Sequence, residues 1–178
     1  MAARDMKPYN IVWNTPSANA SGSMPIGNGE VGANFWVEQN GDIVFYISRT
    51  DSWSETGELF KVGRIRVSIT PSITAENDFV QTLDLGKGRI RIKGNGTALD
   101  FFIDSDNDVI FLTGKAGKPV DVKVAAEVWR NEEFEITPEL AGKMYRSVSG
   151  FVEGQAHFKG YPDKIVSGDE DITVFHHK

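Results

Sequence analysis

Apolar and polar residues alternate in many short segments of the chain, and the 3.6-residue spacing of an amphipathic helix is almost absent. Because successive side chains of a strand point to opposite faces, this pattern predicts half-buried β-strands. The clearest pair covers residues 31–38 and 42–48, joined through Asn40-Gly41. Asn-Gly is the strongest short-range signal for a hairpin turn. We therefore predict a β-hairpin over residues 31–48.

Further segments with the same alternation are separated by glycine or Asx clusters. They cover residues 63–70, 79–85, 89–93, 97–104, 108–113, 120–129 and 172–176. The total of about nine or ten short strands is the number expected for two packed antiparallel sheets. Residues 131–168 are glycine-rich and weakly patterned, which predicts a long connection with one helical turn at Pro138–Lys143. We expect an all-β, antiparallel β-sandwich that forms a single domain over residues 1–178.

The composition of the chain excludes or disfavours several classes of binding partner and of active site. The chain has 178 residues, of which 40% are hydrophobic and 25% charged, so it can bury its own core. A net charge of -6 disfavours binding to nucleic acid or to an anionic membrane. The absence of cysteine excludes disulfides, thiolate metal sites and a cysteine nucleophile. No signal peptide or apolar membrane span is visible, so the residues leave cytoplasm and periplasm open.

A glycine-rich turn, Pro25-Ile26-Gly27-Asn28-Gly29, precedes the predicted hairpin. A phosphate-binding loop would need a helix after the turn, whereas here a strand follows and no lysine is present. We therefore interpret the turn as structural. At least one of Gly27 and Gly29 should adopt a positive φ, which glycine does at little cost.

The same turn, followed by Gly32-Ala33, a hairpin and Asp51-Ser52-Trp53-Ser54, resembles the N-terminal domain of family 95 glycoside hydrolases and related uncharacterised proteins of gut bacteria. The resemblance covers chiefly residues 9–67. It implies a super-β-sandwich followed by an (α/α)6 barrel that holds the catalytic carboxylates, and a periplasmic or secreted location. One departure is Arg49-Thr50-Asp51-Ser52, where that family has asparagine-glutamate-aspartate-threonine.

From this resemblance we expect the chain to be the non-catalytic N-terminal domain of a longer bacterial protein. In that protein it would support a downstream helical catalytic domain of a glycoside hydrolase. The resemblance carries over only residues 25–29 and the loop around Trp53. Two alternatives remain open at this stage. The chain is either a stand-alone module that binds an oligosaccharide, or a purely structural or interaction domain.

Neither catalytic residues nor cofactors are predicted. Glu133 and Glu135 would lie about 6.6 Å apart on a strand face, near the separation that glycosidases use. Acids two residues apart share a face on any exposed strand, however, so we interpret them as a solvated edge. The three histidines, His157, His176 and His177, have no serine and acid partners in a catalytic arrangement.

No metal site is predicted either. Asp104, Asp106 and Asp108 alternate like the start of a calcium-binding EF-hand loop. That loop needs a glycine where Val109 stands and a glutamate where Lys115 stands, so a polar hairpin turn is the better interpretation. The adjacent His176 and His177 would point to opposite strand faces and would not bind one ion together.

The tryptophans are the most suggestive residues. The apolar face of the first hairpin strand consists of Val31, Ala33, Phe35 and Val37. Trp36 must therefore lie on the opposite, polar face. Trp129 is placed in the same way, because the apolar face of its strand consists of Val120, Val122, Val124, Ala126 and Val128. A tryptophan there stacks on a sugar, meets a partner domain or packs beneath a loop. We take Trp36, Trp53, Trp129 and Asn28 as the candidates that face carbohydrate or a partner.

Overall fold

The computed structural model describes residues 5–53, 59–136, 158–167 and 173–176. These residues form β-strands and two short 3-10 helices. The elements are η1 (Lys7–Tyr9), β1 (Ile11–Trp13), η2 (Ala20–Gly22), β2 (Met24–Gly27), β3 (Val31–Val37), β4 (Ile43–Trp53), β5 (Leu59–Thr70), β6 (Val80–Asp84), β7 (Arg89–Gly94), β8 (Thr97–Ile103), β9 (Ile110–Ala116), β10 (Asp121–Glu127), β11 (Phe134–Ile136), β12 (Phe158–Gly160), β13 (Lys164–Ser167) and β14 (Thr173–His176). In the described residues no helix is long and apolar enough to cross a bilayer.

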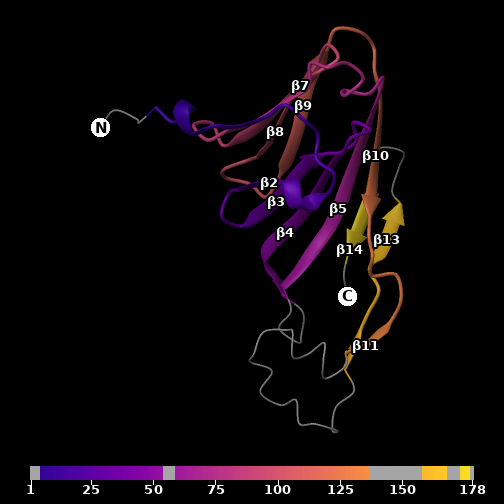
Figure 1. The fold of residues 1–178 in the computed structure, drawn as a ribbon. Helices are drawn as coiled ribbons and strands as arrows, with labels where there is room; N and C mark the ends of the chain where they lie inside the picture. The colour runs from indigo at the N-terminus through magenta and orange to yellow at the C-terminus, as the bar shows by residue number, and fades with distance from the viewer. Residues whose placement is uncertain (1–4, 54–58, 137–157, 168–172, 177–178) are drawn as a thin grey trace.

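Two five-stranded antiparallel sheets pack against each other, which confirms the predicted β-sandwich (Figure 1). Sheet I has the strand order β1-β6-β7-β8-β9, and sheet II has the order β10-β5-β4-β3-β2. The chain passes from sheet I to sheet II between β9 and β10, and both of these strands lie at edges of their sheets. Two further antiparallel strand pairs, β11-β12 and β13-β14, are formed by later segments of the chain.

The predicted hairpin is confirmed as β3 and β4, which pair from Val31 opposite Arg49 to Val37 opposite Ile43. Gly41 in the turn adopts a φ of 90°, which favours glycine. The side-chain oxygen of Asn40 accepts a hydrogen bond of 3.0 Å from the backbone N–H of Asp42. The Asn-Gly pair thus supplies both the conformation and the hydrogen bond that close this turn.

The other predicted strands are observed with shifted ends, the largest difference being an earlier start of β5. The prediction did not include β1, which has three residues, or β2, whose Pro25 and Gly27 favoured a turn. Strands β11 to β13 lie in the stretch for which no strands were predicted. The helical turn expected at Pro138–Lys143 lies outside the described residues.

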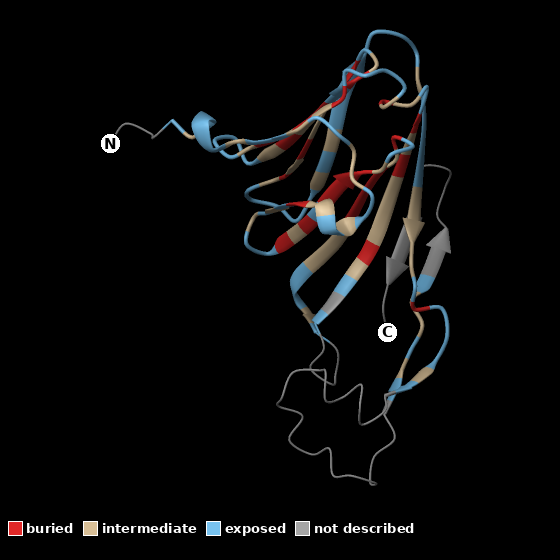
Figure 2. Cartoon of the chain, viewed as in Figure 1, coloured by how far each residue is buried: buried red, intermediate tan, exposed pale blue. Residues whose placement is uncertain are grey.

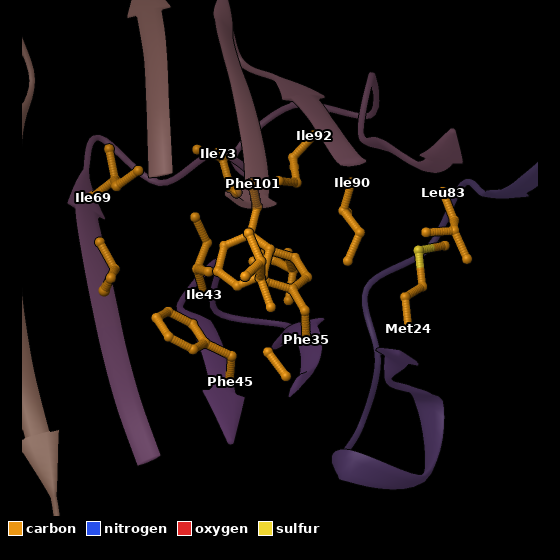
Figure 3. Packing of buried hydrophobic residues seen from close by; sticks show 14 of the residues in the cluster. Met24, Phe35, Ile43, Phe45, Ile69, Ile73, Leu83, Ile90, Ile92 and Phe101 are labelled. Atoms are coloured by element: carbon orange, nitrogen blue, oxygen red, sulfur yellow. The ribbon is translucent and has the colours of Figure 1, made fainter. Parts of the chain in front are cut away.

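The core lies between the two sheets and is built from the strand faces that the alternation predicts (Figure 3). Phe101 of sheet I packs between two rings of sheet II, with ring centroids 4.6 Å from Phe35 and 4.9 Å from Phe45. Met24, Leu83 and isoleucines of both sheets surround this aromatic centre (Figure 3). Burial of these side chains supplies the main free energy that holds the sheets together.

Candidate functional site

The first candidate, Asn28, has both ends of its side chain engaged within the protein. Its Oδ1 accepts hydrogen bonds from the backbone N–H groups of Glu30 at 3.0 Å and Val31 at 2.8 Å. Its Nδ2 donates to the carbonyl oxygens of Asp104 at 2.9 Å and Asn107 at 3.2 Å. Asn28 therefore shapes the β2–β3 turn and fastens it to the β8–β9 loop, and this bonding explains its presence without a ligand.

The two glycines beside Asn28 serve the turn in different ways. Gly29 has a φ of 104°, which confirms that at least one of the pair adopts a positive φ. A Cβ on Gly29 would touch nothing within 4 Å, so the requirement there is conformational. A Cβ on Gly27 would lie 3.0 Å from the carbonyl oxygen of Val31 in the paired strand, so the requirement there is space.

The two motifs that carry the family resemblance meet at one end of the sandwich. Arg49 forms ion pairs with Glu30 at 3.7 Å, Asp51 at 3.3 Å and Asp108 at 2.9 Å. The N–H of Thr50 donates to the carbonyl oxygen of Glu30 at 3.0 Å. These contacts join the β2–β3 turn, the end of β4 and the β8–β9 loop into what we call the rim. Its charged groups are well exposed, so each pair stabilises the fold little.

Trp53 also lies near the end of β4, and its side chain is about half exposed. Its Nε1 donates to the carbonyl oxygen of Thr50 at 2.8 Å, which ties the indole to the strand that carries Arg49. The indole of Trp53 is thus exposed at the end of β4, and its Nε1 is already hydrogen-bonded within the chain.

The predicted hairpin turn at Asp104 is observed as a loop held by its own hydrogen bonds. The Oδ1 atom of Asp104 accepts from the N–H groups of Asp106 and Asn107, both at 2.9 Å. These bonds, with the bond to Asp106 the strongest influence, lower the pKa of Asp104. In the part of the chain that the structure describes, no group of three or more histidine, aspartate and glutamate residues is placed to hold a metal ion.

The outer face of sheet II carries a charge network centred on Arg66 of β5. Its Nη1 lies 2.6 Å from Glu38 and 2.9 Å from Asp42, and its Nε lies 2.7 Å from Glu127. Arg64, two residues earlier on the same face, also pairs with Glu127. The network therefore crosses sheet II from the β3–β4 turn to β10.

These contacts displace the pKa values of the groups involved. Burial alone raises the pKa of Asp42, but hydrogen bonds from Ser68 and Arg66 outweigh this and lower it below its ordinary value. Burial likewise raises the pKa of Glu127, and bonds from Arg66 and Arg64 more than reverse the effect. Hydrogen bonding to Glu38 and to the other carboxylates raises the pKa of Arg66. Asp42, Glu127 and Arg66 are therefore all charged near neutral pH.

An aromatic row lies beside this network on the same face. Trp36 is on the outer face, as predicted, but it is only 2% exposed and cannot stack on a sugar. Its ring centroid lies 5.2 Å from that of Tyr46, which in turn meets Trp129 edge to face at 5.8 Å. The Nζ of Lys61 lies 4.4 Å above the Tyr46 ring. The row runs from a covered tryptophan to one that is 44% exposed, Trp129.

Trp129 is held in place by its chain neighbour. The guanidinium of Arg130 lies 5.6 Å from the centroid of the Trp129 ring. Arg130 makes a two-pronged ion pair with Asp163, with Nε–Oδ1 at 3.0 Å and Nη2–Oδ2 at 2.9 Å. Its Nη1 also donates to the carbonyl oxygen of Lys61 at 3.1 Å. Because the side chains of Arg130 and Asp163 are both buried, these bonds fix the backbone that positions Trp129.

The model of a domain of unknown function, DUF5703_N, matches residues 12–178. The chain belongs to this family. No curated protein matches the chain. The family is described without an activity, and the match does not connect the chain to the family 95 glycoside hydrolases that its motifs resemble.

Glu133 and Glu135 occupy an exposed edge of this DUF5703 domain. Glu133 precedes β11 and pairs with Lys159 at 3.2 Å, with both side chains about half exposed. Glu135 lies within β11, opposite Lys159 in the register of the β11-β12 pair. His157 and His177 lie outside the described residues, as does the side chain of His176.

Sequence reasoning missed the residues that organise the outer face of the DUF5703 domain. Tyr46, Arg64 and Arg66 carried a usable signal, because strand alternation and the register of β3 to β5 place them on the face of Trp36. The pairing of Arg130 with Asp163 had no local signal, since the two residues are 33 positions apart. Only the fold brings them together.

Proposed function

We propose that this chain is a non-catalytic domain of a larger protein and that it docks on a neighbouring domain through Trp129. The observation that carries the proposal is that Trp129 is 44% exposed and yet fixed by Tyr46 and Arg130. A rigid tryptophan that offers part of its apolar face loses little entropy on binding, which is typical of interface anchors. The charged network of Arg64, Arg66 and Glu127 lies beside the aromatic row. It corresponds to the polar periphery that such anchors usually have.

The neighbouring domain in this proposal is a helical catalytic domain of a glycoside hydrolase. The resemblance of residues 25–29 and of the Trp53 loop supports that identity, and with it a periplasmic or secreted location. The family model describes an N-terminal domain, which supports the presence of a further segment after it.

Glu133 and Glu135 are the carboxylates whose spacing on a strand comes near the separation that glycosidases use. Both residues are exposed, and Glu133 pairs with Lys159 at 3.2 Å. This setting favours a solvated edge over an acid and base pair. We expect the chain to hydrolyse no aryl glycoside. Turnover that disappears in Glu133→Gln or Glu135→Gln would contradict this expectation.

A second candidate function is binding of an oligosaccharide by the chain alone. The observation in its favour is that Trp53 and Trp129 are each about half exposed, and an indole is a usual platform for a sugar face. The two candidates differ in the partner of Trp129, so one set of variants separates them.

The test compares Trp129→Ala with the matched control Trp53→Ala, which removes an equally exposed indole at another place. Each variant is titrated by calorimetry with the polypeptide encoded directly after Lys178 and with a panel of oligosaccharides. We expect the downstream polypeptide to bind the wild type and Trp53→Ala, and Trp129→Ala to bind at least about tenfold more weakly. Thermal unfolding checks that Trp129→Ala is folded.

Three results would overturn docking through Trp129. The first is a reading frame that ends at Lys178, and the second is a downstream polypeptide that binds Trp129→Ala as tightly as the wild type. The third is oligosaccharide binding that is lost in Trp129→Ala while the downstream polypeptide shows no affinity, which establishes the second candidate instead.

A further inference from the structure

The sandwich is open along the side where the chain crosses from sheet I to sheet II. In the described residues the two edge strands at this side, β9 and β10, pair only with β8 and β5 and not with each other. Val122 of β10 lies opposite Ile69 in the β10–β5 register, so it is on the side of the buried core. Even so, Val122 is 57% exposed, and Figure 2 shows the first part of β10 as exposed.

A groove of about 210 Å³ occupies this opening between the two sheets. Its apolar lining is aliphatic and comes from Val67, Ile69, Leu99, Leu112, Val120 and Val122. No aromatic side chain of the described residues lines it. Because sugar rings usually bind by stacking on aromatic rings, this groove suits a flexible aliphatic chain better than a sugar ring.

A second cavity, of about 280 Å³, adjoins the groove at the end of the sandwich where β7 turns into β8. We call it the head pocket. It lies among the β5–β6, β7–β8 and β9–β10 connections, and its charged residues are Glu76 and Lys118. Thr97 and Val120 line both cavities, so the groove and the head pocket are neighbours. Small-molecule sites typically measure roughly 300–1,000 Å³, and the two cavities together fall within that range.

Thr97 stands at the junction of the two cavities with its side chain turned inward. It shares the core-facing side of β8 with Leu99 and Phe101, and it is only 7% exposed. Its hydroxyl forms no hydrogen bond with the described residues, yet it is not sealed off from the cavities that it lines. Buried polar groups nearly always have a hydrogen-bond partner. The hydroxyl of Thr97 is therefore placed to bond to a ligand.

The charges of the head pocket favour a ligand head group that is polar but neutral. Glu76 and Lys118 are both exposed, and neither forms an ion pair with the described residues. A carboxylate head would be attracted by Lys118 but repelled by Glu76, and an ammonium head would meet the reverse. Hydroxyl groups both donate and accept, so they match the lysine donor, the glutamate acceptor and the threonine hydroxyl alike.

We propose that the groove and the head pocket form one binding site for a small amphiphile, with an aliphatic chain between the sheets and a neutral, hydroxyl-bearing head at Thr97. Each methylene group that the groove removes from water adds to the affinity, and the head replaces its bonds to water with bonds to the pocket. Trp129 lines neither cavity. The site therefore goes beyond the proposed docking function and stands or falls separately from it.

The test uses octyl glucoside as the probe, below the concentration at which it forms micelles, and measures its binding to the whole chain by calorimetry. We expect saturable binding of one molecule per chain. Methyl glucoside has the same head without the chain, and octanoate has a chain of the same length with a charged head. Each should bind at least about tenfold more weakly than octyl glucoside.

Three variants locate the bound probe. Thr97→Val keeps the shape of the side chain and removes its hydroxyl, which should weaken binding about fivefold or more. Val122→Asp sets a charge on the wall of the groove and should weaken binding about tenfold or more. The matched control is Val124→Asp, the same change on the same side of β10 at a residue that does not line the groove. It should leave binding unchanged, and thermal unfolding checks that each variant is folded.

Absence of saturable binding by the wild type would overturn the proposal. So would binding that either Thr97→Val or Val122→Asp leaves unchanged, or that Val124→Asp weakens as much as Val122→Asp, because the probe would then lie elsewhere. Octanoate that binds as tightly as octyl glucoside would contradict the neutral head. Displacement of the probe by the polypeptide encoded after Lys178 would also overturn the proposal, since that polypeptide would then be the occupant of the groove.

Discussion

The middle of sheet II and its β10 edge are built from similar alternating sequences but have opposite environments. On β3, Phe35 faces the core and Trp36 faces outward, and both are buried. On β10, Val122 faces the core and Lys123 faces outward, and both are exposed. Strand β3 pairs with β2 and β4, whereas β10 pairs only with β5 in the described residues. Alternation therefore fixes which face a side chain occupies, and the surrounding layers decide whether it is buried.

This difference separates residues that hold the fold from residues that remain for a partner. The apolar side chains of β3 have neighbours on both faces, so their burial already contributes to stability. The valines of β10 expose apolar surface that the described fold does not use. Apolar surface of this kind on a free edge is typical of an interface.

The largest expected effect is at the centre of the core. Phe35→Ala removes a ring that is in contact with Phe45 and Phe101, and it leaves a cavity in a closely packed region. We expect the free energy of unfolding to fall by about 3–5 kcal/mol, measured by urea denaturation. A loss of less than about 1 kcal/mol would mean that the middle of sheet II is no better packed than its edge.

The next effect concerns the charge network on the outer face. Arg66→Ala leaves Glu38, Asp42 and Glu127 without their shared cation in a partly buried setting. We expect a loss of about 2–3 kcal/mol, somewhat below the cost of breaking a fully buried pair. Arg91→Ala is the control, because Arg91 pairs with Asp100 at a more exposed site and should cost less than about 1 kcal/mol. Equal losses for the two variants would contradict a central role for Arg66.

The same network predicts a pH dependence. The pKa values of Asp42 and Glu127 are lower in the folded chain than their ordinary values of 3.8 and 4.5. Their contribution to stability is therefore complete above those ordinary values and is lost as the pH falls through the lowered ones. The stability difference between the wild type and Arg66→Ala should shrink below about pH 4. A difference that is constant from pH 7 to pH 2 would show that the network is not electrostatic.

A smaller effect is expected at the turn that joins β2 to β3. Gly29→Ala forces a side chain into a positive φ without any new contact, so the cost is conformational and should be about 1 kcal/mol. Gly86→Ala is the matched control, since no positive φ is recorded there and a Cβ would meet its neighbours at ordinary distances. If both variants melt with the wild type, the turn does not depend on Gly29.

The smallest effect is expected at the free edge. Val124→Thr keeps the branched shape and changes a side chain that is 64% exposed, so the free energy of unfolding should change by less than about 0.5 kcal/mol. Chemical denaturation of dilute protein measures this change. A loss of 2 kcal/mol or more, as in a core position, would show that β10 is covered within the single chain.

The parts of the fold that local sequence determines were predictable. The β3–β4 hairpin followed from Asn40-Gly41 and the alternation around it, and the outward direction of Trp36 followed from the same alternation. The burial of Trp36 did not, because it depends on residues such as Tyr46 that reach it from a neighbouring strand.

The candidate site was less predictable because its contacts are long-range. The role of Asn28 depends on Asp104, which is 76 residues away. The fixed position of Trp129 depends on Tyr46 and on the ion pair of Arg130 with Asp163. No local sequence pattern predicts the partners of Asn28 and Trp129. They can be identified only once the pairing of the strands is known.

The central claim, that Trp129 is a docking anchor, is tested most directly by oxidative footprinting of the four tryptophans. Alone, the chain should show fast oxidation of Trp129 and Trp53 and slow oxidation of Trp36, which is covered. In the presence of the polypeptide encoded after Lys178, Trp129 should become protected while Trp36 stays unchanged. Oxidation of Trp129 at the same rate with and without that polypeptide would contradict the claim.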